Sequence, residues 1–121
     1  MGLFSSKSKT KFNWIELKSE QQLDELIASS ATTPVLLFKH STRCSISSMA
    51  LNRFESNWTA DQQACTCVYL DLIALRPISN AIASKLKVEH QSPQAILIKD
   101  KKVVHVSTHG DINAKRIQEN L

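Results

Sequence analysis

The sequence has few of the residues that break or cross-link a fold. It contains 2 glycines, 3 prolines and 3 cysteines among 121 residues. An odd number of cysteines, two of them closely spaced, does not match the disulfide framework of a small secreted protein. No apolar run approaches the roughly 20 residues of a membrane span, and the N-terminus lacks the apolar segment of a signal peptide. We therefore expect one cytoplasmic domain without membrane association.

The charge is only mildly biased. The formal net charge of +4 comes from 15 Lys and Arg against 11 Asp and Glu, and Lys7, Lys9 and Lys11 supply part of the excess. Residues 1–12 show no apolar periodicity, so we predict a disordered basic tail there and a folded domain over 13–121. Few aromatic residues accompany the tail and no nucleic-acid motif follows it, so a solvated tail is favoured over a nucleic-acid arm.

The apolar pattern alternates between strands and helices. It predicts strands near 14–17, 35–38, 68–70, 95–98 and 103–106, the last two forming an antiparallel hairpin around "KDKK". The predicted helices begin with the capping box of Ser19 and Gln22, after Cys44, at Pro77 and at Asp111. This order predicts an α/β fold of three layers, with a mixed central sheet and helices on both faces.

Helical spacing also predicts which side chains point inward after Cys44. Ile46, Met49, Ala50 and Phe54 repeat at the helix period, with polar residues between them. We therefore expect these four residues to form the inner face of the helix, and Cys44 to lie at its N-terminus.

Cys44 is the candidate nucleophile. Free backbone N–H groups at a helix N-terminus and the basic residues Lys39, His40 and Arg43 favour the reactive thiolate. Hydroxyl groups of Ser41, Thr42, Ser45 and Ser47 could add hydrogen bonds. The alternative is an inert buried cysteine, but such a residue normally replaces an apolar residue inside a periodic stripe. The polar, basic surroundings favour a functional thiol.

Two other features have simpler explanations. Cys65 and Cys67 lie on one face of a predicted strand, where core packing is favoured over metal binding. A metal carrier using this pair is the interpretation ranked last. Pro93 stands directly before a buried strand, where it either starts the strand or presents the Ser92 peptide edge to a ligand.

Two separated motifs carry a family resemblance. The segments "FKHSTRCSIS" at 38–47 and "SPQAILIKDKKVVHVSTHGDI" at 92–112, with "WIEL" and "QLDELI" near the start, resemble the monothiol bacilliredoxins of the thioredoxin superfamily. The resemblance extends over about residues 13–121. It implies a thioredoxin-like fold and thiol exchange with mixed disulfides between proteins and bacillithiol, a small bacterial thiol.

The resemblance also implies roles for individual residues. Cys44 would be the nucleophile, and Ser92 with a cis Pro93 would hold the substrate backbone or the small thiol. The expected substrate-binding residues are Thr42, Arg43, Ser45, Ser47, Ser92, Pro93, His109 and Gly110. Lys39 is a further candidate partner for the carboxylates of bacillithiol. The family commonly has a proline where this chain has Ser45, a difference that leaves the nucleophile in place.

The C-x-x-S motif of Cys44 and Ser47 has no second thiol to resolve a mixed disulfide, so an external thiol must do so. We expect bacillithiol as the co-substrate, no bound cofactor and no metal. The expected partners are bacillithiolated proteins, with a monomeric enzyme and no nucleic acid. The alternative is a redox-silent thioredoxin-like module that binds proteins through the Pro93 edge.

Overall fold

The computed structural model describes residues 12–121 apart from Thr42 and Gln62. Its elements alternate between strands and helices, as predicted. In chain order they are β1 (Ile15–Glu16), α2 (Glu20–Ser29), β2 (Val35–His40), α3 (Ser45–Asn57), β3 (Thr66–Asp71), α4 (Arg76–Leu86), β4 (Gln94–Lys99), β5 (Lys102–Thr108), the 3₁₀ turn η1 (His109–Asp111) and α5 (Ala114–Gln118).

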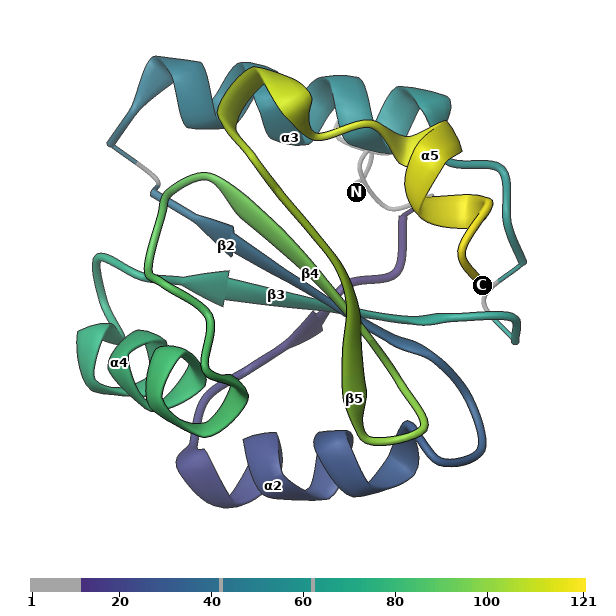
Figure 1. The fold of residues 1–121 in the computed structure, drawn as a ribbon. Helices are drawn as coiled ribbons and strands as arrows, with labels where there is room; N and C mark the ends of the chain where they lie inside the picture. The colour runs from purple at the N-terminus through teal and green to yellow at the C-terminus, as the bar shows by residue number, and fades with distance from the viewer. Residues whose placement is uncertain (1–11, 42, 62) are drawn as a thin grey trace, which may run out of the picture.

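The five strands form one mixed sheet in the order β1-β3-β2-β4-β5. β3 runs parallel to β1 and β2, whereas β4 is antiparallel to β2 and β5 (Figure 1). The ladder between β4 and β5 shifts register between Leu97 and Ile98. Because β2 and β4 are antiparallel neighbours, the last residues of β2 lie at the same end of the sheet as the start of β4. The loop from β2 to α3 begins at this end.

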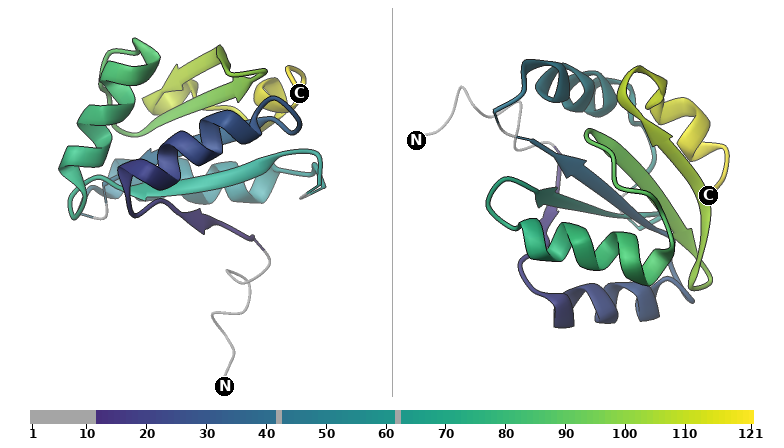
Figure 2. Two further views of the ribbon diagram at one scale, coloured as in Figure 1. Left: turned by 90° about the horizontal axis from the view of Figure 1, so that it is seen from below. Right: turned by 60° about the vertical axis from the view of Figure 1, so that its left-hand side comes forward.

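Helices cover both faces of the sheet, which confirms the predicted α/β class. Helices α2 and α4 lie on one face and α3 and α5 on the other (Figures 1 and 2). The side chains of β2 alternate between the two faces: Val35 and Leu37 pack towards α2 and α4, and Leu36 and Phe38 pack towards α3 and α5. The sheet therefore separates two apolar cores.

The described part of the chain includes one residue, Phe12, that the sequence assigns to the predicted tail. Residues 1–11 lie outside the described part of the chain, so the structure does not bear on the predicted tail there. Phe12, however, stacks on Trp14 with ring centroids 4.5 Å apart and lies against Phe54. The indole of Trp14 donates a hydrogen bond of 2.6 Å to Glu55 of α3. Phe12 thus belongs to the core between the sheet and α3.

One helix cap is confirmed and another is wrong. Ser19 caps α2 by accepting a hydrogen bond from the N–H of Gln22. The last helix is capped by Asn113, whose side chain accepts from the N–H of Arg116, rather than by Asp111. Asp111 ends the turn η1, and Ile112 between the two is buried, which delays the helix until Ala114.

The inner face of α3 is displaced by one residue from the prediction. Ala50 and Phe54 are buried, but Ile46 and Met49 are 63% and 65% exposed. The third inward position belongs to Ser47, which is fully buried. Positions 47, 50 and 54 lie on one side of a helix, whereas position 46 is rotated about 100° away.

Candidate active site

Cys44 lies where β2 gives way to α3. It is the N-cap residue of α3, with extended backbone, and its carbonyl accepts the first helical hydrogen bond, from Ser48. Its own N–H donates to Ser41 O at 3.1 Å, which closes a tight turn after β2. The side chain is half-buried and makes no capping hydrogen bond. Cys44 is therefore partly exposed at a helix N-terminus, the position that the sequence predicts.

Ser47 supports this loop from inside. Its hydroxyl oxygen accepts a hydrogen bond from the N–H of Ser41 at 3.1 Å and lies 2.7 Å from Nδ1 of His40. Since Ser47 is fully buried, its hydroxyl faces the interior. The expectation that Ser47 contacts substrate is therefore wrong: it fixes the path of the chain before Cys44.

His40 is a site residue that sequence reasoning noted only as a nearby cation. It is buried, and its ring lies 5.5 Å from that of Tyr69. Burial lowers the pKa of His40, partly opposed by Asp71. The imidazole is therefore neutral near pH 7, and its Nδ1 shares a hydrogen bond with the hydroxyl of Ser47.

The predicted substrate edge lies beside the same end of β2. The Ser92–Pro93 peptide bond is cis, as expected from the resemblance. Lys39 stands opposite Gln94 in the antiparallel ladder, so Pro93 lies at the edge where β2 ends. The N–H of His109 donates to Pro93 O at 3.0 Å, which brings η1 to this edge. The hydroxyl oxygen of Ser92 is buried without a hydrogen-bond partner among the described residues.

The remaining predicted residues differ in accessibility. Arg43, Ser45, His109 and Gly110 are exposed, and Pro93 is buried. Thr42 lies outside the described residues. Lys39 is fully buried on the face of β2 opposite to His40. Its predicted role as a direct partner of substrate carboxylates is therefore wrong, because the sheet and α4 cover it.

Cys65 and Cys67 are core residues. Both are buried and pack with Leu36, Phe54 and Ile117 between the sheet and helices α3 and α5. A hydrogen bond with the Cys65 side chain, together with burial, raises the pKa of Cys67. Among the described residues there is no group of three or more potential metal ligands. The core-packing interpretation is confirmed.

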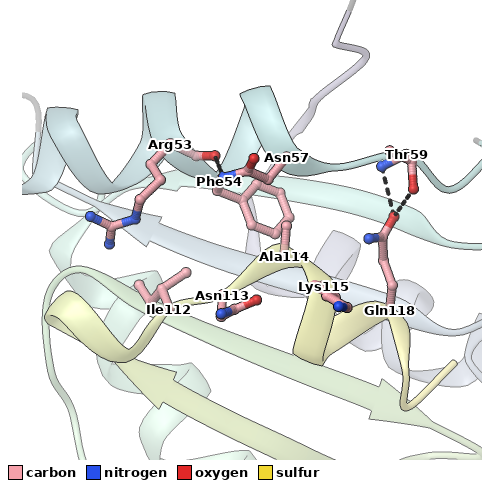
Figure 3. A pocket seen from close by; sticks show the side chains of 9 residues that line it. All are labelled: Arg53, Phe54, Asn57, Thr59, Ile112, Asn113, Ala114, Lys115 and Gln118. Atoms are coloured by element: carbon pink, nitrogen blue, oxygen red, sulfur yellow. Dashed lines mark hydrogen bonds between the residues drawn. The ribbon is translucent and has the colours of Figure 1, made fainter.

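A separate groove runs between α3 and α5, away from Cys44. Its volume is about 520 Å³, and Arg53, Phe54, Lys115 and Gln118 are among its lining residues (Figure 3). Arg53 lies nine residues after Cys44, which is about 13 Å along a helix. The carboxamide oxygen of Gln118 accepts hydrogen bonds from the backbone and hydroxyl of Thr59. No cysteine lines this groove.

A half-buried cysteine at the N-terminus of α3 and a cis proline before β4 lie after and beside the last residues of β2 in a mixed sheet, and together they define a thiol oxidoreductase of the thioredoxin fold. A solved chain described as an oxidoreductase with a thioredoxin fold is 31% identical, with a TM-score of 0.74 and coverage of 87% of this chain and 90% of that one. The family model for the monothiol bacilliredoxin BrxC matches residues 15–117. The chain belongs to the monothiol bacilliredoxin BrxC family.

More distant structures share the fold. A variant thioredoxin from Halobacterium salinarum is 19% identical, with a TM-score of 0.62 over 88% of this chain and 85% of that one. A thioredoxin from Malassezia sympodialis is 14% identical, with a TM-score of 0.67 over 89% of this chain and 87% of that one. In the described part of the chain, no helix is both long and apolar enough to cross a membrane.

Proposed function

We propose that this protein removes bacillithiol from mixed disulfides on other proteins, using Cys44 as its single exchanging thiol. The observation that carries the proposal is the contrast between the three cysteines. Cys44 is accessible at the N-terminus of α3, whereas Cys65 and Cys67 are buried in the core. Ser47, at the position where a second thiol would resolve the disulfide, is engaged with His40 and Ser41.

The proposed exchange has two steps. The Cys44 thiolate attacks the bacillithiol sulfur of the mixed disulfide, and the substrate protein leaves as a thiolate that takes up a proton. Cys44 then carries bacillithiol in a new disulfide. The thiolate of a second bacillithiol attacks that adduct, which regenerates Cys44 and releases oxidised bacillithiol. The two electrons that reduce the substrate disulfide therefore come from bacillithiol thiols.

Exposed groups around Cys44 are suited to the small thiol. Arg43 and His109 can donate hydrogen bonds to the carboxylates of bacillithiol, and Ser45 at the start of α3 and Gly110 in η1 are exposed as well. Ser92 and Pro93 offer a backbone edge for the substrate protein. We expect the protein to act as a monomer in the bacterial cytoplasm, with bacillithiolated proteins as partners and no bound cofactor.

Intact-protein mass spectrometry tests this proposal. Reduced wild type is mixed with oxidised bacillithiol, and we expect one bacillithiol adduct, located on Cys44 by peptide mapping. Reduced bacillithiol should then remove it. Oxidised glutathione serves as the comparison thiol, and Cys44→Ser, which should form no adduct, as the matched control.

Two outcomes would contradict the proposal. An adduct on Cys65 or Cys67 would mean that a different thiol exchanges. Failure of Cys44 to react, with partner binding that Cys44→Ser retains, would instead support a redox-silent binding module.

A further inference from the structure

Lys39 is a lysine in the centre of the sheet. It stands on β2 between Leu70 of β3 and Gln94 of β4, and its side chain is fully buried. A buried ammonium group is costly unless a partner compensates it. The salt bridges found among the described residues do not include Lys39. Such a residue beside an active-site loop requires a functional explanation.

The partner of Lys39 is a histidine. Its Nζ lies 3.0 Å from Nδ1 of His90, and the hydroxyl of Ser79 on α4 lies 3.2 Å from the same nitrogen. An ammonium group can only donate, so Nδ1 must accept. The ring of His90 is therefore neutral, with its proton on Nε2.

His90 belongs to the segment that leads into the substrate edge. After α4 ends at Leu86, Lys87 adopts a left-handed conformation, and residues 88–93 return to the sheet. Gln94 donates a side-chain hydrogen bond to Glu89 O at 3.0 Å, which holds the same segment. Ser92 and Pro93 follow His90 after one intervening residue, Gln91. The Lys39–His90 bond therefore ties the strand that ends before Cys44 to the segment that presents Pro93.

We propose that Lys39 and His90 are positioning residues that hold the Ser92–Pro93 edge in register with Cys44, and that protonation of His90 releases this edge. The inference rests on the proposed function. Protonated Nδ1 cannot accept, and it places a second cation beside Lys39. The hydrogen bond then breaks, and the two cations repel each other.

The surrounding charges favour the bonded state. Burial lowers the pKa of His90, and Lys39 and Arg76 lower it further. Burial, with Arg76, lowers the pKa of Lys39 to about 8, so Lys39 is largely charged near pH 7. Ser79 and Gln94 are neutral, and Glu89 contributes its backbone carbonyl. The Lys39–His90 hydrogen bond, called the tie below, is therefore formed at neutral pH. It is lost only in acid, below the ordinary imidazole pKa of 6.5.

Steady-state kinetics of exchange with a bacillithiolated protein test the Lys39–His90 hydrogen bond. Loss of this bond should change KM, which reports substrate binding, and leave kcat unchanged. In His90→Asn, the side-chain oxygen can accept from Lys39 but does not titrate. We expect KM of wild type to rise about 5-fold in acid, the effect of losing one hydrogen bond, while KM of His90→Asn stays flat. Lys39→Met should raise KM by a similar factor already at neutral pH. Thiol chemistry is common to all variants, so kcat should follow pH alike in each.

A readout without turnover separates this inference from the proposed function. The amide signals of Ser92 and Gln94 in ¹⁵N NMR spectra should move with the protonation of His90 in wild type and stay fixed in His90→Asn. Ring ¹⁵N shifts should place the proton on Nε2, and Lys39→Met should change them. If wild type exchanges no bacillithiol, the proposed function fails while the NMR titration still decides the tie. The inference would be overturned if the amide signals of Ser92 and Gln94 did not move with the protonation of His90. It would also be overturned if KM of His90→Asn rose in acid as much as KM of wild type.

Discussion

Replacement of Cys65 and Cys67 by alanine together should leave bacillithiol exchange almost unchanged. In the parallel ladder Cys67 stands opposite Leu36, four residues before His40. At about 3.3 Å per residue, this places Cys67 about 13 Å along the sheet from the end of β2. Disulfide formation requires Cα atoms about 4.4–6.8 Å apart. Neither buried thiol can therefore reach Cys44 without unfolding of the core.

The expected size of the effect follows from the same geometry. Groups more than about 10 Å apart couple weakly, so the exchange rate of the double variant should lie within about twofold of wild type. Loss of two buried sulfur atoms should lower the free energy of unfolding by about 1 kcal/mol each. The variant should therefore remain folded at 25 °C, where the assay is run.

The assay follows release of bacillithiol from a modified protein by mass spectrometry, with wild type, the double variant and Cys44→Ser in parallel. Cys44→Ser should release none. The reasoning is refuted if the double variant accumulates as a Cys44 mixed disulfide that wild type resolves without added thiol, because an internal resolving cysteine would then exist.

Three further predictions concern stability and are measured by urea unfolding. Ser47→Ala should lower the free energy of unfolding by about 1–3 kcal/mol, because the Ser41 N–H and His40 Nδ1 lose their partner; an unchanged midpoint would contradict this network. Gly110→Ala should change stability by less than about 0.5 kcal/mol, since an added Cβ meets nothing within 4 Å; a large loss would show a tighter loop. Stability should also fall as pH drops below 6.5, because burial lowers the pKa of His40, His90 and His105 in the folded state and the unfolded chain then binds more protons; a flat profile between pH 7.5 and 5 would exclude this.

Local patterns were enough to predict the order of the elements. The continuous apolar run at 35–38 marks a strand covered on both faces, and the capping box at Ser19 marks the start of α2. Cys44 could be placed at a helix N-terminus because the period changes there from that of a strand to that of a helix. These signals depend only on residues that are close together in the sequence, so one sequence is enough to reveal them.

The wrong predictions concern residues whose burial or role depends on a partner that is distant in the sequence or on the packing of the folded chain. Ile46 was favoured over Ser47 for the inner face of α3 because apolar residues usually face inward, but His40 and Ser41 provide the buried partners that Ser47 needs. The sequence favours Lys39 as a partner of substrate carboxylates because its actual partner, His90, lies 51 residues away. The cap of α5 was assigned to Asp111 because both Asp and Asn cap helices, and only the burial of Ile112 distinguishes the two positions.

The outer strand β5 has a consequence for association between copies of the chain. The outer edge of β5 carries backbone groups that pair with no other strand of this sheet. The side chains of Val104 and Val106 on β5 are 44% and 41% exposed. Open strands of this kind are templates for aggregation. The register shift at Leu97 and Ile98 and the charge of Lys102 interrupt that template, because a second copy laid against β5 would meet a twisted, positively charged border. Even at high protein concentration, the molecules should therefore stay separate rather than pair through β5 into growing sheets.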